Sequence, residues 1–444
     1  MVFDSHHLTH HPTMPIEYLT DQVLGQALQS YGSPLYVYDL DLIARRYKQL
    51  QGCLPPNFRL HYALKANANL TICRRFAQLG AAAEVSSLGE LITALRVGFD
   101  PEEIVFTGPG KSRQELLAAL AEGVALVVVE SIGEARRLDE LAAAQAVVQP
   151  VLLRVNPAYR SANSCEVRSG EADGPACDTL KPIAMNGQGA SKFGVDEAAM
   201  AATLAALLEM KHLEFRGIHV FTESNVLDYR QLLAAWQNTA AIAAKLHASG
   251  IPVHTLDFGG GIGIAYNDVD EEFDTVGFGV ALAEHFASGA KPHHCILEMG
   301  RYLIGEAGYY LAEVLDVKES QGQRFVILHG GIHNLYRTPA MQPASRYLRV
   351  LGKGDSPMRP AVLAGQLPTP VDVMVREVSL PEDITIGDVV AIQNCGAYGY
   401  NHSLTNFALH PYPAEVAYAG GNMVVIRDRG TYDDFFVHQK LVEI

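Results

Sequence analysis

The sequence predicts an α/β protein in which a (β/α)8 barrel is joined to a C-terminal antiparallel β-domain. Between residues 58 and 307, short apolar or β-branched segments alternate eight times with amphipathic segments. Eight such units in ~250 residues are typical of a barrel, whereas an open doubly wound sheet usually has fewer strands. After residue 308, Val, Ile and Tyr alternate with polar residues between Gly and Pro breaks, which indicates antiparallel strands.

The barrel region is expected to contain eight strands, each followed by a helical segment. The expected strands are Arg59–Leu64, Ala81–Val85, Ile104–Thr107, Leu126–Val129, Val151–Val155, Gly217–Phe221, Thr255–Phe258 and Cys295–Glu298. The expected helices are Leu70–Leu79, Leu88–Val97, Arg113–Ala121, Gly133–Ala144, Glu197–Met210, Leu232–Ser249, Glu271–Ala287 and Tyr302–Ala307. In the β-domain, strands are expected at Tyr309–Val317, Arg324–Leu328, Asp372–Val378, Asp388–Gln393 and Met423–Arg427.

Four regions follow from this pattern. Residues 1–33 are expected to form a tail and a helix, and residues 34–57 a strand and linker shared with the β-domain. The barrel is expected over residues 58–307 and the β-domain over 308–444. Within the barrel, residues 159–190 are polar, rich in Gly and Ser, and aperiodic. A loop this long after the fifth strand predicts a lid on the catalytic face that shapes specificity for an extended substrate.

Composition excludes several classes of protein. The net charge is −15 and no basic block is present, so nucleic acid is not an expected partner. No stretch is long and apolar enough for a membrane span, and the N-terminus does not resemble a signal peptide. Six cysteines at scattered spacings indicate neither a disulfide framework nor a zinc site. The sequence therefore predicts a cytoplasmic protein without a metal centre.

The chemistry of a barrel gathers where its strands end, at the C-terminal face. A lysine, Lys65, ends the first expected strand, and a buried amine of lowered pKa is what a Schiff base with an aldehyde requires. A strand cap that reaches solvent is the alternative for this lysine. The other expected strand ends carry Glu84, Gly108–Gly110, Glu130, Arg154, His219, Gly259–Gly261, Glu298 and Arg301.

Two of these strand ends could bind a charged group. Three successive glycines, Gly259–Gly261, can bring backbone N–H groups against a phosphate, although they equally suit a tight turn. Glu298 and Arg301 place a carboxylate and a guanidinium three residues apart, which is also compatible with a surface ion pair.

Five motifs, in order, resemble the signature of fold type III (alanine racemase-like) pyridoxal-phosphate decarboxylases, the relatives of diaminopimelate and ornithine decarboxylases. The resemblance covers about residues 34–413. Its motifs are YALKAN at Tyr62–Asn67, GIH at Gly217–His219, LDFGGG at Leu256–Gly261, EMGR at Glu298–Arg301 and CGAY at Cys395–Tyr398. A narrower similarity, to siderophore-biosynthesis decarboxylases of the staphyloferrin B and achromobactin type, lies in Gly217–Asn225, Gly308–Asp316, Gly365–Pro370 and His410–Pro413.

The resemblance implies a role for each matching residue. Lys65 would carry pyridoxal 5'-phosphate as a Schiff base, His219 would stack on its ring, and Glu298 would face the pyridine nitrogen. A carboxylate there keeps that nitrogen protonated, which suits decarboxylation and argues against a racemase. The phosphate would be held by Thr222, Gly259, Gly260, Gly261, Arg301 and Tyr398. The substrate would be contacted by Asn334, Arg337 and Asp372.

One position departs from the family pattern. At the position of Pro368, relatives carry a cysteine that reaches the active site of the partner subunit. That cysteine helps to protonate the substrate's Cα. The acidic residue that follows in ornithine and diaminopimelate enzymes is Thr369 here, as in the siderophore branch. Another group or water could supply the proton, the enzyme could be slow, or the chain could be a regulator without turnover. Cys395 is expected to be a buried, inert thiol.

The sequence thus predicts a homodimeric carboxy-lyase with shared active sites. The expected substrate is a citrate-conjugated diaminopropionate or serine-type siderophore intermediate. Diaminopimelate, ornithine and lysine are the alternatives within the class. An amino-acid racemase and an inactive pyridoxal-phosphate-binding regulator are the alternatives outside it.

Overall fold

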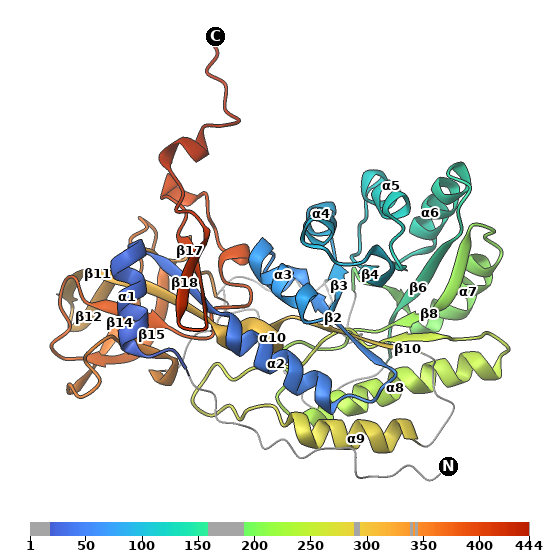
Figure 1. Ribbon diagram of the computed structural model, residues 1–444, viewed down its shortest axis with the longest axis horizontal. Coiled ribbons are helices and arrows are strands. Elements are labelled where there is room, and N and C mark those ends of the chain that lie inside the picture. Colours follow the sequence, from blue (N-terminus) through green and yellow to red (C-terminus); the bar gives the residue numbers. More distant parts are fainter. Residues whose placement is uncertain (1–17, 159–190, 288–293, 338–340, 342–344, 444) are drawn as a thin grey trace, which may run out of the picture.

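The computed structural model describes residues 18–158, 191–287, 294–337, 341 and 345–443. It contains a parallel barrel and a second, mixed sheet, which lie side by side (Figure 1). The predicted barrel and β-domain are therefore confirmed. The predicted lid at residues 159–190 lies outside the described residues. Within the described ranges, no helix has the length and apolar character that crossing a membrane requires.

Eight parallel strands form the barrel, and pairing of β5 with β6 closes it. The short strand β7 (Val195–Asp196) extends the sheet beside β6. The barrel strands are β2 (Phe58–Ala63), β3 (Ala82–Val85), β4 (Ile104–Phe106), β5 (Leu126–Val129), β6 (Gln149–Asn156), β8 (Leu213–His219), β9 (Thr255–Asp257) and β10 (His294–Met299).

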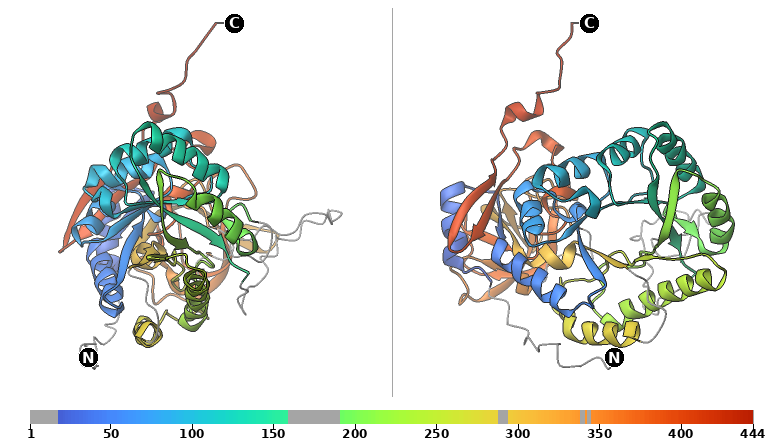
Figure 2. Two further views of the ribbon diagram at one scale, coloured as in Figure 1. Left: turned by 90° about the vertical axis from the view of Figure 1, so that its right-hand side faces the viewer. Right: turned by 45° about the vertical axis from the view of Figure 1, so that its right-hand side comes forward.

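Helices surround this ring of strands (Figure 2). Several of them begin or end where the sequence supplies a cap. In α5, for example, Ser112 and Glu115 form a capping box, and Gly123 ends the helix in the left-handed region. The helices that follow the barrel strands are α3 (Leu70–Gln78), α4 (Leu88–Val97), α5 (Arg113–Glu122), α6 (Ile132–Ala144), α7 (Met200–Leu208), α8 (Tyr229–Ala248), α9 (Thr275–Ala287) and α10 (Arg301–Ile304).

The β-domain is built on a nine-stranded sheet that includes the first strand of the chain. Most neighbours are antiparallel, as predicted, but β1 pairs with β17 and β12 pairs with β14 in parallel. Its strands are β1 (Leu35–Asp39), β11 (Gly308–Ser320), β12 (Gln323–Leu328), β13 (Leu348–Val350), β14 (Met358–Ala364), β15 (Val373–Pro381), β16 (Val389–Ile392), β17 (Ala414–Ala419) and β18 (Asn422–Arg427).

Two helices precede the barrel. Helix α1 (Asp21–Tyr31) packs against β1 in a small apolar cluster of the β-domain, with Leu24 and Leu28 buried. Helix α2 (Leu40–Cys53) occupies most of the segment that was expected to be a linker. Its buried face includes Ile43 and Tyr47, and both belong to one large apolar cluster that continues from the barrel into the β-domain. That shared core fixes the β-domain against the barrel.

Candidate active site

The carboxyl ends of five barrel strands bring together a lysine, a histidine and three carboxyl groups. Lys65 follows β2 in a short 3-10 turn, η2 (Leu64–Ala66), and Glu84 lies in β3. His219, Asp257 and Glu298 lie in β8, β9 and β10, which are neighbours in the sheet. Parallel strands place all five at the same end of the barrel, where the sequence predicted the catalytic face.

Lys65 is paired with Glu84. The Lys65 Nζ donates to Glu84 Oε2 at 2.6 Å, and the Glu84 carboxylate also accepts from Ser86 Oγ at 2.9 Å and from the Thr107 hydroxyl. Desolvation lowers the pKa of the Lys65 amine, but Glu84 and Glu298 outweigh it, so that pKa stands above its usual value. This direction is opposite to the lowered pKa that the sequence analysis associated with a Schiff-base lysine, because Glu84 was not recognised there as the partner of Lys65.

His219 and Glu298 form a buried pair. The His219 Nε2 lies 3.5 Å from Glu298 Oε2, and each side chain is less than 5 % exposed. Burial alone would raise the pKa of Glu298, but His219, Lys65 and Arg154 outweigh it and lower that pKa to about 2. Neither ring nitrogen of His219 makes a hydrogen bond, and Glu298 Oε1 makes none. Glu298 is thus an ionised carboxylate with unused hydrogen-bonding capacity.

The three glycines after β9 form a turn that no larger residue fits. A Cβ at Gly259 would lie 2.8 Å from the Phe221 ring, and one at Gly260 would lie 2.5 Å from the Glu298 carbonyl oxygen. The Val226 N–H donates to the Gly261 carbonyl at 2.8 Å, which holds the segment after β8 beside the turn. That segment carries Thr222, which is buried. The predicted phosphate-binding glycines and Thr222 therefore lie in neighbouring segments.

Arg301 and Tyr398 meet at the junction of the two domains. The Arg301 guanidinium lies 4.8 Å from the centre of the Tyr398 ring and donates to Tyr266 Oη at 2.8 Å. Its Nε is buried without a hydrogen-bond partner. The Tyr398 N–H donates to the Ala66 carbonyl at 2.9 Å, so the β-domain contributes to the site directly beside Lys65.

The three predicted substrate-binding residues all lie in the β-domain, and their polar groups are largely occupied. The Asp372 carboxylate accepts hydrogen bonds from the N–H groups of Ile332 and Leu367, each at 2.8 Å. It thereby joins the loops that contain these two residues. The Asn334 Oδ1 accepts from Tyr310 Oη at 3.4 Å. The Arg337 guanidinium donates to the carbonyls of Met341, Gln393 and Asn394 and to Cys395 Sγ.

A cavity of about 540 Å³ lies in the β-domain. Thr369 and Asp372 line it, together with residues of β12, β14 and β15 such as Phe325, Val362 and Arg376. The space beside the 365–372 loop is therefore hollow in a single chain.

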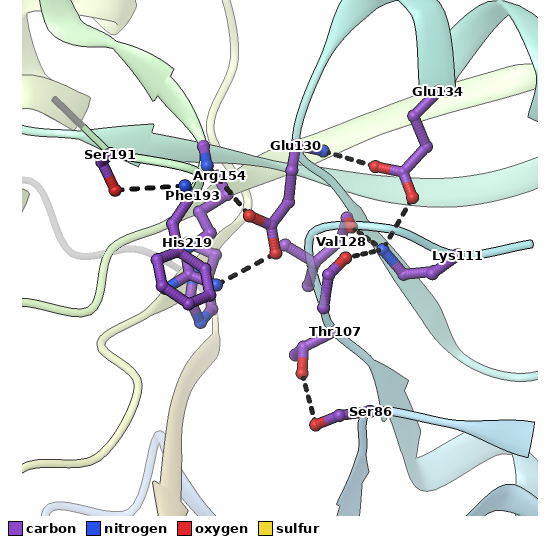
Figure 3. Close-up of polar contacts among 12 residues, drawn as sticks. Ser86, Thr107, Lys111, Val128, Glu130, Glu134, Arg154, Ser191, Phe193 and His219 are labelled. Atoms are coloured by element: carbon purple, nitrogen blue, oxygen red, sulfur yellow. Dashed lines mark hydrogen bonds and ion pairs between the residues drawn. The ribbon is translucent and has the colours of Figure 1, made fainter. Parts of the chain in front are cut away.

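A second polar network surrounds the site on β5 and β6 and was not assigned from the sequence (Figure 3). The Arg154 guanidinium donates to Glu130 Oε1 at 3.0 Å and lies 4.4 Å from the centre of the Phe193 ring. Glu130 Oε2 accepts the Gly194 N–H at 2.9 Å. The buried Lys111 donates to Glu134 at 3.0 Å. Of the residues in this network, only Glu130 and Arg154 were noted from the sequence, as strand ends. No local motif marks the residues that they contact.

The comparisons with known proteins agree with this geometry. The family described as "Pyridoxal-dependent decarboxylase, pyridoxal binding domain" matches residues 40–174 and 176–305. The chain is 33% identical to a diaminopimelate decarboxylase of Methanothermobacter thermautotrophicus, over 93% of this chain and 92% of that protein. It is 31% identical to an L-glutamyl-[BtrI acyl-carrier protein] decarboxylase of Niallia circulans, over 93% and 95% of the two chains.

A third relative and a solved structure extend these findings. A 2-[(L-alanin-3-ylcarbamoyl)methyl]-2-hydroxybutanedioate decarboxylase of Staphylococcus aureus is 30% identical, over 88% of this chain and 96% of that protein. The crystal structure of diaminopimelate decarboxylase from Helicobacter pylori, complexed with L-lysine, superposes with a TM-score of 0.81 at 28% identity. It covers 93% of this chain and 98% of that one.

Proposed function

The chain belongs to the pyridoxal-dependent decarboxylase family and is an amino-acid decarboxylase that uses pyridoxal phosphate. From that premise we propose that its substrate carries carboxylates at its far end, which is the end opposite the amino-acid group that loses CO2. A citrate-conjugated diaminopropionate or serine-type siderophore intermediate has this chemistry. Diaminopimelate, ornithine and lysine are the competing substrates. Each carries an ammonium at its far end, and in diaminopimelate a carboxylate stands beside that ammonium, whereas the citryl conjugates carry carboxylates without an ammonium there.

The residues at the barrel end fit the cofactor. The buried Glu298 Oε1 and His219 nitrogens lack hydrogen-bond partners, the glycine turn leaves space that a Cβ would fill, and Arg301 Nε is unpartnered. These are the features required by a pyridine nitrogen, an aromatic ring and a phosphate. We assign Lys65 to hold the cofactor covalently, and the phosphate to Thr222, Gly259, Gly260, Gly261, Arg301 and Tyr398.

The chain's own residues would divide the remaining tasks. Pyridoxal phosphate, when bound, accepts the electron pair that departing CO2 leaves behind. Glu298, ionised by its cationic neighbours, would hold a proton on the pyridine nitrogen. His219 would lie against the ring and fix its plane. Glu84 would receive a hydrogen bond from the Lys65 ammonium whenever the lysine is released.

One observation carries the choice of substrate: the acidic groups that could bind a distal ammonium are missing or already used. Thr369 stands where ornithine and diaminopimelate enzymes have an acid, and both Asp372 oxygens accept backbone N–H groups. Arg337, by contrast, pairs with no carboxylate among the described residues, and its Nε is buried without a hydrogen-bond partner. A distal carboxylate suits that charge distribution better than a distal ammonium does.

The names of two relatives support a conjugated substrate. The Staphylococcus aureus relative is named for an alanine derivative joined through an amide to a hydroxybutanedioate, which carries two carboxylates. The Niallia circulans relative is named for a glutamyl group attached to a carrier protein. At 30–33% identity, the diaminopimelate decarboxylase is equally similar. The decision therefore rests on the residues and on direct measurement.

The test is CO2 release from citryl-diaminopropionate, citryl-serine, diaminopimelate, ornithine and lysine, compared as kcat/KM. A citryl conjugate is expected to be preferred over every diamine precursor. The matched variant Thr369→Asp is expected to reduce that preference by about 10-fold or more, since it adds a carboxylate beside the distal group. Preference of the unaltered protein for diaminopimelate, ornithine or lysine would refute the proposed substrate.

The same assay separates the remaining alternatives. Turnover would show that Pro368 does not prevent protonation of Cα, whereas a bound cofactor without CO2 release from any substrate would favour the regulator. Epimerisation of alanine or lysine without CO2 release would indicate a racemase.

We further propose a homodimer with shared active sites, located in the cytoplasm. Apolar side chains exposed near the end of the chain, including Phe407, Tyr432 and Phe436, suit burial against a second copy. The four described cysteines form no disulfides, which is compatible with a reducing compartment. Light scattering of the purified protein tests the dimer: a monomer at micromolar concentration would refute it.

A further inference from the structure

Asp257 is a buried carboxyl group for which the proposed chemistry has no use. It lies at the end of β9, between His219 on β8 and Glu298 on β10, and is fully buried. Its Oδ1 accepts the Gly259 N–H at 2.8 Å, but its Oδ2 has no hydrogen-bond partner. One carboxylate oxygen of Asp257, one of Glu298 and one ring nitrogen of His219 lie within 4.8 Å of one another.

Two ionised carboxylates at this distance in a buried site would repel each other strongly. Such a pair usually retains one proton, so that it carries a single negative charge. The proton belongs on the member that has fewer cations around it. Lys65 and Arg154 lower the pKa of Glu298, and the His219 Nε2 lies 3.5 Å from Glu298 Oε2. Asp257 forms no ion pair with a basic side chain among the described residues, and its strongest charged neighbours are Glu298 and, more weakly, Glu84.

We propose that Asp257 is a positioning residue that retains a proton and donates it as a hydrogen bond to Glu298. The donated bond would occupy one Glu298 oxygen and orient the other toward the cofactor. It would also keep the negative charge on Glu298, where it can face the pyridine nitrogen. Burial raises the pKa of Asp257 well above its usual range, and the Glu298 charge raises it further, in agreement with this assignment.

This inference rests on the role proposed for Glu298, but it can be tested without substrate. Asp257→Asn is the matched variant, because an amide keeps the shape, the acceptor for the Gly259 N–H and a donor toward Glu298. Asp257→Val removes the donor and both acceptors. Asp139→Asn is the control, because it removes an aspartate that lies in the outer helix α6, away from the site. The side chain of Asp139 is 25% exposed.

The first measurement is infrared difference spectroscopy of the full-length protein at neutral pH, with and without pyridoxal phosphate. The carbonyl band of one protonated carboxyl group is expected to disappear in Asp257→Asn and to remain in Asp139→Asn. An unchanged band in Asp257→Asn would overturn the proposal. So would stoichiometric metal in the purified protein that is lost in this variant, since the three side chains would then be metal ligands.

Thermal unfolding supplies a readout that a purely structural role would not change. A carboxyl group whose folded pKa is above its unfolded value of 3.8 contributes stability at low pH and loses it as pH rises toward the folded pKa. The Tm of Asp257→Asn minus that of the unaltered protein is therefore expected to increase steadily from pH 5 to pH 8. A difference that stays constant over this pH range would contradict a proton on Asp257.

Cofactor affinity gives the third readout. Asp257→Asn is expected to bind pyridoxal phosphate within about 3-fold of the unaltered protein, and Asp257→Val about 10-fold or more weakly, because Glu298 loses its donor. Equal weakening in both variants would mean that the charge of Asp257 matters, and would overturn the proposal. If the CO2 assay fails while the infrared band behaves as expected, only the proposed substrate is refuted.

Discussion

The barrel end and the β-domain loops both carry polar residues that the sequence assigned to binding. The two regions differ in whether the polar atoms of these residues have hydrogen-bond partners within the chain. At the barrel end, His219 and Glu298 are buried with unpartnered atoms. In the β-domain, both oxygens of Asp372 accept hydrogen bonds from the chain itself. Unpartnered buried polar atoms are costly, so they persist where a ligand completes them, whereas saturated ones hold a scaffold together. Position near a motif does not separate these two cases, but hydrogen-bond satisfaction does.

The sharpest test of this comparison is Lys65→Ala. We expect complete loss of the visible absorbance of bound pyridoxal phosphate and of CO2 release, because no other residue is proposed to hold the cofactor covalently. The Tm of the cofactor-free protein should fall by only about 2–4 °C, since 43% of the Lys65 side chain is exposed and the buried Glu84 keeps its hydrogen bonds from Ser86 and Thr107. Residual cofactor-dependent turnover would remove Lys65 from its role.

Glu298→Gln tests the other side of the barrel end. We expect the variant to retain the cofactor while kcat falls by about 10²–10³, because the amide cannot hold a proton on the pyridine nitrogen. Absorbance of the bound cofactor and single-turnover CO2 release measure the two effects separately. Normal kcat would mean that Glu298 is only a buried partner of His219.

Asp372→Asn tests the β-domain. An asparagine keeps one acceptor and places an NH2 group against a backbone N–H, so we expect a loss of about 1–3 kcal/mol in unfolding free energy. Once folded, the variant should retain its KM within about 3-fold. A large rise in KM at unchanged Tm would break the comparison, because Asp372 would then act on substrate as the sequence predicted.

Glu84→Gln examines a fully paired group inside the barrel. Removing the Glu84 charge lowers the pKa of the Lys65 amine, so more of the lysine is neutral at a given pH. We expect the cofactor-free variant to take up pyridoxal phosphate several-fold faster at pH 7, with the pH profile of uptake displaced to lower pH. An unchanged profile would show that Glu84 does not control the lysine.

The smallest effect concerns one buried histidine in each region. Burial lowers the pKa of His61 in the barrel and of His333 in the β-domain to about 4. Their neutral forms contribute stability above pH 6.5 that is lost as pH falls toward 4, by at most about 1.4 kcal/mol per pH unit for each histidine. His333→Gln should reduce the acid slope of Tm between pH 6.5 and 4.5, and an unchanged slope would show that folding does not lower the pKa of His333.

Periodic segments explain how much of the fold could be predicted. Leu88–Val97 and Leu126–Val129 have the predicted bounds because their patterns are local. Strand β14 was missed because Pro360 interrupts its pattern, and α2 because it follows a strand directly. Lys65, His219 and Glu298 were predicted from motifs, and the structure brings them to the same end of the barrel. The partnership of Lys65 with Glu84, and of Asp257 with Glu298, depends on pairing between neighbouring strands, which no local pattern contains.

The placement of β1 has a consequence for synthesis of the chain. This strand is made first, yet its neighbours in the sheet are β11 and β17, so its parallel partner emerges roughly 380 residues later. At about 5–20 residues per second, the ribosome needs about 20–75 s to supply that partner. Both edges of β1 are unpaired until β11 emerges, and the edge that pairs with β17 stays open after that, while the barrel can already close. An open edge is the state in which nascent chains associate with one another or with chaperones.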